Sequence, residues 1–483
     1  MRKYQIVFLI LGSLCLGLGM ISGFVALMSR FVYADQAAAS FFATTIVSGF
    51  LGGILYLLGR DAEPAIDYRG AVALTAGAWM GLPLLAAIPF TGVAVGLDWT
   101  DAVFESVSGI TTTGSTVMTG LDSASPSILL WRAFLQWIGG IGIIGISIAI
   151  LPFLRVGGMQ LFQMESSNQS RDRVIARPGQ LAASIVLLYL GLTLGCIAGY
   201  LATGMAGFEA ATHAMTTVST GGYSTSDASM GNFSAGSQWV AIVFMIAGSL
   251  PFLAYVRFFS QFHLLSFAAH EEIVTFLVIV AAFTLLLVLS QTGPDLGAGD
   301  RIRSALFVTA SLITTTGYAV GDYQLWGPLA ITGAFVLTFL GGCAGSTAGG
   351  FKAFRVLIVL KSIRRALNQA SMPNSVVRAH HAGRQLTDED IASVALFGGL
   401  FVGTFAVAAI LLSAMGLDPV SALTASATAI ANVGPGLGEV IGPAGNFIPL
   451  PDAAKWLLCG VMLMGRLELV VILLLFTPRF WMR

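Results

Sequence analysis

The stretch SGITTTGSTVMTG, residues 108–120, places three threonines and a glycine between two long apolar segments. The chain around it has 483 residues, of which 56% are hydrophobic and only 10% are charged. A soluble domain carries about 25% charged residues, so most of this chain must face lipid or other apolar helices. Threonine is a poor residue for helix interiors, so the polar run requires a structural reason.

Ten apolar segments are long enough to cross about 30 Å of hydrocarbon at roughly 1.5 Å per residue. They cover residues 4–29, 38–59, 70–95, 126–154, 181–203, 236–262, 272–292, 327–360, 391–415 and 453–477. The first is too long for the core of a signal peptide and no small-residue cleavage site follows it, so we expect a retained helix. The pattern predicts an all-α polytopic membrane protein.

The charged residues predict the orientation. With ten crossings both termini lie on one side, which receives 18 lysines and arginines against five on the other. The positive-inside rule then places both termini in the cytoplasm. The outer side holds 13 acidic residues against its five bases, and an acidic face attracts cations. Ordinary solvation of loops explains the same excess equally well.

The segment that leads into the threonine run is helix-like but too short to cross the membrane. It covers about 14 residues, or near 20 Å. It begins outside, and the next span also begins outside, so the chain must dip into the membrane and return. We therefore expect a short re-entrant helix followed by a loop, which is tolerated at this depth when protein or water surrounds it.

The same pattern recurs three times, as FEAATHAMTTVSTGGYS (208–224), RSALFVTASLITTTGYA (303–319) and VSALTASATAIANVGPG (420–436). Aligned on the glycine, the four loops are Thr111-Thr112-Thr113-Gly114, Val218-Ser219-Thr220-Gly221, Thr314-Thr315-Thr316-Gly317 and Ala431-Asn432-Val433-Gly434. The glycines are 107, 96 and 117 residues apart, which indicates an internal repeat of span, short helix, loop and span.

Four re-entrant loops around one axis favour ion conduction. Their backbone carbonyls can replace the hydration shell of an ion. Glycine allows the backbone to turn with φ > 0, and the carbonyl ends of the short helices favour a cation. Tight packing between helices would explain a single copy, but four copies in register favour a pore.

The repeats resemble the Trk/Ktr/HKT superfamily of potassium transporters. The segments SGITTTGSTVMTGLDS, STGGYSTSDASM, NVGPGLG and MGRLELV are similar to its bacterial TrkH/TrkG branch, and so are the two additional spans at the N-terminus. The resemblance implies K⁺ uptake across the bacterial inner membrane, with K⁺ bound at the 16 loop residues above as a selectivity filter. The loop ANVG departs most from TTTG, which implies pseudo-fourfold symmetry around one pore.

The resemblance also implies a homodimer in the lipid bilayer and a cytosolic partner, a TrkA-like ring that binds NAD or ATP/ADP. No other cofactor and no nucleic acid are expected. We divide the chain into a two-helix segment, residues 1–65, and four helix–pore loop–helix repeats, residues 66–178, 179–270, 271–385 and 386–483.

The third repeat contains the glycine-rich stretch FLGGCAGSTAGGFKAFR, residues 339–355. Each glycine costs a helix up to about 1 kcal/mol relative to alanine. A nucleotide-binding P-loop would need lysine directly after Gly350, where Phe351 stands. Close packing of helices through small residues is a second alternative. We expect an unwound loop below the filter that obstructs the pore, formed by Gly345, Ser346, Thr347, Ala348 and Gly349.

Arg466 lies inside the last span, where a charge needs a partner or water. A structural ion pair with Glu468 or with a neighbouring helix is the alternative, but residues two apart point about 200° from each other on a helix, so Glu468 is a poor direct partner. We expect Arg466 to face the pore and to bond the carbonyls of residues 345–349 as part of the gate.

The remaining features are less specific. The four cysteines are Cys15, Cys196, Cys343 and Cys459, and they fit buried apolar positions rather than a zinc site or disulfides. His213 fits a structural role. The polar segment 361–390 either anchors the chain at the membrane or docks a regulatory subunit.

Two other classes of protein are considered. A secondary symporter, coupling K⁺ or Na⁺ to H⁺ or Na⁺, is built on inverted repeats, whereas all four repeats here run the same way. An enzyme would need paired acids, HExxH or a nucleophile and base at one membrane depth, and none is found. We therefore expect a transporter and not an enzyme.

Overall fold

The computed structural model describes residues 4–63, 66–149, 178–261, 270–291, 297–372, 380–381, 384–467 and 469–482. Within these ranges the regular structure is helical except for one antiparallel pair, β1 (His380–His381) and β2 (Arg384–Gln385). Seven of the described helices are long and apolar enough to cross a membrane, or up to nine when two bent pairs each count as one span. The protein is therefore an all-α polytopic membrane protein, as predicted.

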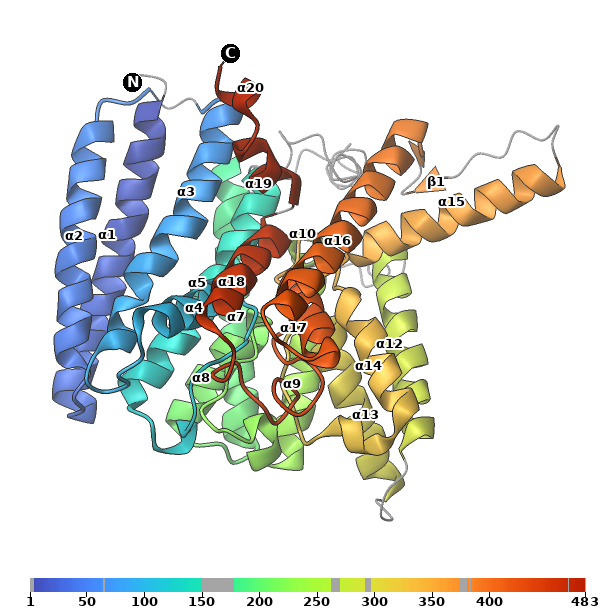
Figure 1. Ribbon diagram of the computed structural model, residues 1–483, viewed down its shortest axis with the longest axis horizontal. Coiled ribbons are helices and arrows are strands. Elements are labelled where there is room, and N and C mark those ends of the chain that lie inside the picture. Colours follow the sequence, from blue (N-terminus) through green and yellow to red (C-terminus); the bar gives the residue numbers. More distant parts are fainter. Residues whose placement is uncertain are drawn as a thin grey trace.

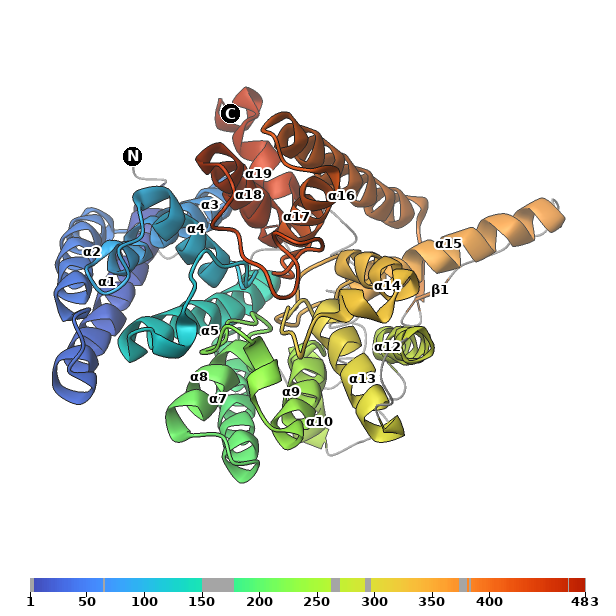
Figure 2. The same ribbon diagram turned by 60° about the horizontal axis from the view of Figure 1, so that its bottom comes forward.

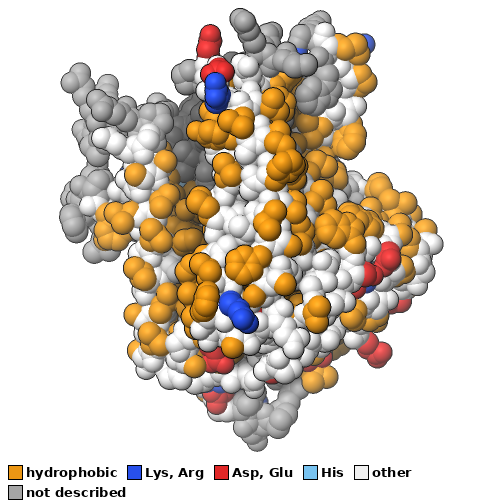
Figure 3. Space-filling view, turned by 90° about the vertical axis from the view of Figure 1, so that its left-hand side faces the viewer, with side chains coloured by type: hydrophobic (Ala, Val, Ile, Leu, Met, Phe, Trp, Pro, Cys, Tyr) orange, Lys and Arg blue, Asp and Glu red, His pale blue; other side chains and the backbone are white. Residues whose placement is uncertain are grey.

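The N-terminal segment is a helical hairpin of α1 (Gln5–Met28) and α2 (Ala38–Gly59), joined through a π-helical turn at Ser29–Tyr33. The two backbones approach closely at glycines, because a Cβ on Gly12 would lie 2.8 Å from the carbonyl oxygen of Gly52. Small residues allow such contact between membrane helices. Figure 3 shows a broad belt of hydrophobic side chains over this side of the molecule, as a lipid-facing surface requires.

Each of the four repeats contains an outer helix, a short helix and a second long segment. The first two repeats comprise α3 (Tyr68–Ala86), α4 (Trp99–Ile110), α5 (Pro126–Ala149), α7 (Pro178–Ala202), α8 (Gly207–Val218), α9 (Ala235–Gly248) and α10 (Phe252–Gln261). The last two comprise α12 (Glu271–Ser290), α13 (Ala298–Ile313), α14 (Pro328–Phe339), α15 (Ala353–Ser371), α16 (Asp388–Ala414), α17 (Pro419–Ala431), α18 (Asp452–Arg466), α19 (Leu469–Leu475) and α20 (Pro478–Trp481). Single 3₁₀ turns cover Ile88–Thr91, Leu121–Ser123, Ser229–Asn232 and Tyr323–Trp326.

The repeats surround a common centre. Figure 2 shows the short helices α4, α8, α13 and α17 around the middle of the molecule, with α1 and α2 outside the ring of repeats. The loops that follow the short helices converge at this centre. The N- and C-termini lie at the same end of the molecule (Figure 1).

Three of the predicted spans are interrupted, and in one of them, 327–360, the break falls in the glycine-rich stretch where an unwound loop is expected. The predicted span 236–262 bends by 91° between α9 and α10, where Pro251 provides no N–H group to continue the helix. The predicted span 453–477 divides into α18 and α19. The predicted span 327–360 ends with α14 at Phe339, and α15 then runs away from the bundle (Figure 1).

Several residues on which the sequence predictions depend lie outside the described ranges. They include the last residues of the predicted span 126–154, residues 373–379 and 382–383 of the polar segment, Glu468, and Asp295 of the outer acidic residues. Eight of the basic residues counted for the cytoplasmic side also lie there, namely Arg2, Lys3, Arg155, Arg171, Arg173, Arg177, Arg378 and Arg483.

Candidate ion-binding site

All four short helices end in the same turn. Each is followed by one residue in the left-handed region, Thr112 (φ 52°), Thr220 (φ 53°), Thr315 (φ 57°) and Asn432 (φ 55°). The N–H of the next residue donates to the carbonyl five positions earlier, from Thr113 to Ser108, Gly221 to Thr216 and Thr316 to Ser311 at 2.9 Å, and from Val433 to Thr428 at 3.0 Å. This is the Schellman pattern of helix termini. The four loops therefore share one backbone geometry.

Three of these four left-handed residues are threonines. A β-branched residue with positive φ is an outlier that costs of order 1–3 kcal/mol. Glycine would adopt the same turn without strain. Such strain persists only where the surrounding structure holds it, and it concentrates at functional sites. The residues Thr112, Thr220 and Thr315 are fully buried, so the protein encloses the turns completely.

A second positive φ follows two residues later and is always a glycine. These glycines are Gly114 (φ 85°), Gly222 (φ 78°), Gly317 (φ 79°) and Gly434 (φ 109°). The second loop therefore consists of Ser219, Thr220, Gly221 and Gly222, and its predicted alignment on Gly221 is wrong by one residue. Val218 is the last residue of α8 instead. The adjacent glycines of STGGYS offer two alignments, and only the backbone geometry distinguishes between them.

Each of these glycines faces a carbonyl of the next loop. A Cβ built on Gly434 would lie 2.8 Å from the Thr113 oxygen. A Cβ would come closer still on the other three glycines, from Gly114 to the Gly221 oxygen, from Gly222 to the Thr316 oxygen and from Gly317 to the Val433 oxygen. The contacts run from loop one to two, three, four and back to one. We call the carbonyl groups of Thr113, Gly221, Thr316 and Val433 the carbonyl ring.

The side chains of the loops bond to one another instead of filling the ring. The Thr111 and Thr113 hydroxyls share a hydrogen bond of 2.7 Å, and so do those of Thr314 and Thr316. The Asn432 amide donates to the Thr113 hydroxyl at 3.0 Å and so joins the fourth loop to the first. The short polar side chains therefore brace the backbone that carries the ring.

The surroundings of the ring favour a cation. The carbonyl ends of α4, α8, α13 and α17 lead directly into the loops and carry partial negative charge. The ring glycines Gly114, Gly222 and Gly317 line a hollow of about 190 Å³, together with Asp227. The described residues contain no group of three or more His, Cys, Asp or Glu that could hold a metal ion. The carbonyl oxygens of the ring are candidate cation ligands because such groups can replace the hydration shell of an ion.

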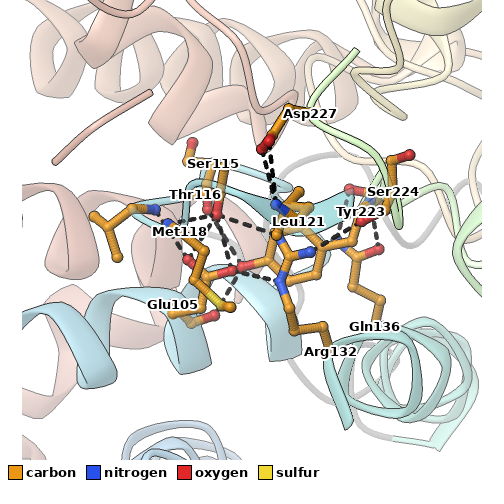
Figure 4. A network of polar contacts seen from close by, with 12 residues as sticks. Glu105, Ser115, Thr116, Met118, Leu121, Arg132, Gln136, Tyr223, Ser224 and Asp227 are labelled. Atoms are coloured by element: carbon orange, nitrogen blue, oxygen red, sulfur yellow. Dashed lines mark hydrogen bonds and ion pairs between the residues drawn. The ribbon is translucent and has the colours of Figure 1, made fainter. Parts of the chain in front are cut away.

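The first two loops are tied together by a buried ion pair that the sequence analysis did not identify (Figure 4). Glu105 on α4 accepts from Arg132 Nε of α5 at 2.8 Å and from Val117 N of the first loop at 3.0 Å. Arg132 also donates to the Ser224 carbonyl of the second loop at 3.0 Å. Buried charges are tolerated when they are paired in this way. The presence of Glu105 and Arg132 within apolar segments was therefore the one sequence signal that could have predicted this ion pair.

A second ion pair fastens α4 one turn closer to its N-terminus. Lys455 of α18 contacts Asp101 on α4, and the lysine side chain is almost fully buried. Asp101 and Glu105 lie four residues apart on the same face of α4. The first short helix is therefore held between the long helices of repeats one and four.

The glycine-rich segment of the third repeat forms a loop, residues 340–352, directly below the carbonyl ring. The Thr347 hydroxyl donates to the Val218 carbonyl at 3.1 Å, at the end of α8. Gly349 N donates to the Thr315 hydroxyl at 2.6 Å. A Cβ on Gly349 would lie 2.5 Å from the Ala431 carbonyl oxygen. The loop thus contacts the second, third and fourth repeats from the inner side.

Both ends of this loop are fastened to the protein. The Glu272 carboxylate of α12 accepts from Ala344 N at 2.6 Å and from Phe354 N at 3.2 Å. Cys343 N donates to the Ser249 carbonyl at 2.9 Å. The backbone groups of the loop thus form hydrogen bonds with other elements, whereas in a helix they would bond to one another. The predicted unwound segment is therefore present and is held at its base.

Arg466 lies at the end of α18 and is 4% exposed. Its Nη2 donates to the Thr347 carbonyl at 2.8 Å. Its Nε and Nη1 have no hydrogen-bond partner among the described residues. The guanidinium group therefore holds the tip of the loop and adds a positive charge below the ring.

The remaining predicted residues occupy structural positions. His213 is buried in α8, where its ring nitrogens contact the Glu209 carbonyl at 2.9 Å and the Ser224 hydroxyl at 3.0 Å. The four cysteines are buried and form no disulfides.

The chain is similar to known proteins over nearly its whole length. The family model TrkH, described as cation transport protein, matches residues 37–482. The Trk system potassium uptake protein TrkI of Halomonas elongata is 45% identical over 410 residues, 84% of this chain and 83% of that protein. The Trk system potassium uptake protein TrkH of Escherichia coli K12 is 35% identical over 473 residues, 96% of each chain.

A solved structure has the same architecture. The crystal structure of the potassium transporter TrkH from Vibrio parahaemolyticus matches with a TM-score of 0.90 and 32% sequence identity, and the match covers 100% of both chains. The family model and the solved structure both match this chain along the full length of the repeats. The chain therefore belongs to the TrkH family of cation transport proteins.

Proposed function

We propose that this protein takes up K⁺ across the bacterial inner membrane through the carbonyl ring. The observation that carries the proposal is the closed cycle of four carbonyl oxygens, each set against a glycine of the neighbouring loop. Carbonyl oxygens arranged in this way replace the water molecules around a cation. The names of the relatives supply the identity of the ion, since they are potassium uptake proteins. A transporter, rather than an enzyme, is the function that they support.

We assign the selectivity filter to the four structurally equivalent loops. It comprises Thr111, Thr112, Thr113 and Gly114, Ser219, Thr220, Gly221 and Gly222, Thr314, Thr315, Thr316 and Gly317, and Ala431, Asn432, Val433 and Gly434. Passage beyond the filter is controlled by residues 345–349 and Arg466. The loop lies across the inner side of three repeats, and the guanidinium repels a cation that leaves the ring, so conduction requires both to move.

The orientation and partners belong to the same proposal. The termini lie at one end of the molecule, and we place that end in the cytoplasm (Figure 1). The exposed Arg364 on α15 and the Arg365–Asp388 ion pair lie in the polar segment expected there. A TrkA-like ring that binds NAD or ATP/ADP, and a homodimer, are the assemblies that the family resemblance implies.

The proposal is tested by K⁺ uptake. Expression should restore growth of a K⁺-uptake-deficient bacterium at low K⁺, and the purified protein in liposomes should take up ⁸⁶Rb⁺ with weak competition from Na⁺. A well-expressed protein that restores no growth, with or without a regulatory subunit, and that carries no ⁸⁶Rb⁺ in liposomes would contradict the proposal.

A further inference from the structure

The second filter loop lacks a side chain at one position. The residue before the ring glycine is Thr113 in the first loop, Thr316 in the third and Val433 in the fourth, but Gly221 in the second. In the first and third loops this threonine bonds the hydroxyl two residues earlier at 2.7 Å. The second loop has no side chain of its own to brace the corresponding carbonyl.

Gln136 occupies the space where that side chain would lie. A Cβ built on Gly221 would be 2.8 Å from Gln136 Nε2, 2.5 Å from Oε1 and closer still to Cδ. Gln136 belongs to α5 of the first repeat and is fully buried. Gly221 and Gln136 are thus complementary in volume, because any side chain at position 221 would collide with the Gln136 carboxamide.

Both ends of the Gln136 carboxamide bond the second loop. Nε2 donates to the Gly221 carbonyl at 2.6 Å, and Oε1 accepts from Tyr223 N at 3.0 Å. This donor and acceptor pair determines which way the amide group faces. The Gly221 carbonyl is a member of the carbonyl ring, so the amide acts directly on a candidate ion ligand.

Arg132 reinforces this contact from the same helix. It lies four residues before Gln136, on the same face of α5, and donates to the Ser224 carbonyl at 3.0 Å. Figure 4 shows Arg132 and Gln136 reaching toward Tyr223 and Ser224. The backbone of residues 221–224 is therefore held from outside by a helix of the preceding repeat.

We propose that Gln136 replaces the missing side chain of the second loop and is a positioning residue for ion selectivity. Its carboxamide holds the Gly221 carbonyl in the place that the first and third loops set with their own threonine side chains. A carbonyl that is held in place cannot close around a smaller ion, so Gln136 contributes to the preference for K⁺ over Na⁺. The inference rests on the proposed function, since it takes the ring as the ion site.

The first test removes the hydrogen bonds at nearly constant volume. Gln136→Met in the full-length protein should lower the K⁺-over-Na⁺ preference of uptake into liposomes about tenfold, as expected for one lost hydrogen bond to an ion ligand. The preference is measured from ⁸⁶Rb⁺ uptake under competition by K⁺ and by Na⁺, with the maximal rate recorded separately. A merely structural role would change the amount of active protein and the maximal rate, but not the preference.

The matched control is Gln238→Met on α9. Gln238 is also buried and also donates to backbone carbonyls, those of Met230 at 3.2 Å and Phe233 at 3.3 Å. Both carbonyls lie outside the ring. The ion preference of this variant should equal that of the wild type.

The second test moves the side chain back to the loop. Gly221→Thr alone should lose selective uptake because its side chain meets Gln136. The double variant Gln136→Ala with Gly221→Thr gives the second loop the residue found in loops one and three, and it should restore the preference to within about threefold of the wild type. If Gln136→Met does not accumulate in the membrane, this rescue decides the question.

The inference is overturned if Gln136→Met keeps the wild-type preference, or if the double variant discriminates no better than Gly221→Thr. These results differ from failure of the proposed function, in which the wild-type protein itself carries no K⁺ or Rb⁺.

Discussion

The segment that follows the filter loop packs in the same way in the first, second and fourth repeats, and it packs differently in the third. In the others a glycine of the long helix lies against a carbonyl at the end of the short helix, Gly139 at Ile110, Gly248 at Val218 and Gly465 at Ile430. In the third repeat α14 ends at Phe339, and loop 340–352 enters the space below the ring. The outer half of the pore thus follows the repeat, whereas the inner half departs from it.

This difference separates two tasks. An ion site needs equivalent ligands, and the four loops provide them with one turn and one pattern of hydrogen bonds. A gate needs an element with two positions, which a continuous packed helix does not provide. Loop 340–352 of the third repeat leaves its backbone bonded to neighbouring repeats, and those contacts can be exchanged.

Gly114→Ala should reduce K⁺ uptake about a hundredfold or more, because the new methyl group meets the Gly221 carbonyl and the backbone has φ 85°. The measurement is ⁸⁶Rb⁺ uptake by equal amounts of purified protein in liposomes. Gly53→Ala on α2 is the matched control, since its Cβ would meet no atom within 4 Å. Full activity of Gly114→Ala would show that the symmetric ring is not the conducting site.

Arg466→Ala, and separately deletion of residues 345–349, should raise ion flux about tenfold in the absence of any regulatory partner. Each removes the hydrogen bond between Arg466 and Thr347, and the first also removes the buried positive charge. Uptake is compared with that of the wild type at equal protein density. Unchanged flux in both variants would exclude the loop as the gate.

Glu272→Ala should raise the basal flux about threefold, because both ends of the loop lose the carboxylate that accepts from Ala344 and Phe354. Glu272→Gln retains an acceptor oxygen and should have a smaller effect. The order wild type, glutamine, alanine in uptake rate is the expected result. A lower rate for alanine than for the wild type would show that Glu272 supports conduction rather than closure.

Asp227→Asn should slow K⁺ uptake about twofold at low ionic strength and have no effect at high salt. Asp227 is exposed at the hollow above the ring, so it attracts cations through water and is screened by ions. Asparagine keeps an acceptor for Leu121 N, which limits structural change. The readout is the initial rate of uptake at several ionic strengths. A salt-independent loss would indicate a structural role instead.

Much of this architecture could be predicted from local patterns. The repeat and the glycine-rich break are visible because they recur or because they violate the expected composition of a span. The hydrogen bond of Arg466 to the loop followed from the cost of a buried charge. The register of the second loop could not be predicted, since Gly221 and Gly222 are equivalent in the sequence and differ only in φ.

The contacts between residues far apart in the chain could not be predicted from the sequence either. Gln136 and Gly221 are 85 residues apart, and their relation depends on how repeat one packs against repeat two. The same is true of Asp101 with Lys455, and of Glu272 with both ends of the loop. Pro251 was a local indication that the predicted span 236–262 is interrupted. The length of the apolar run nevertheless led to the prediction of one continuous helix.

The central claim is that four carbonyl oxygens of equivalent loops bind the transported ion. The most direct measurement is the anomalous diffraction of crystals grown with Rb⁺ or Tl⁺ in place of K⁺. We expect a peak on the axis among the carbonyl oxygens of Thr113, Gly221, Thr316 and Val433, and no such peak in Gly114→Ala. An ion bound only at acidic side chains such as Asp227, with nothing inside the ring, would contradict it.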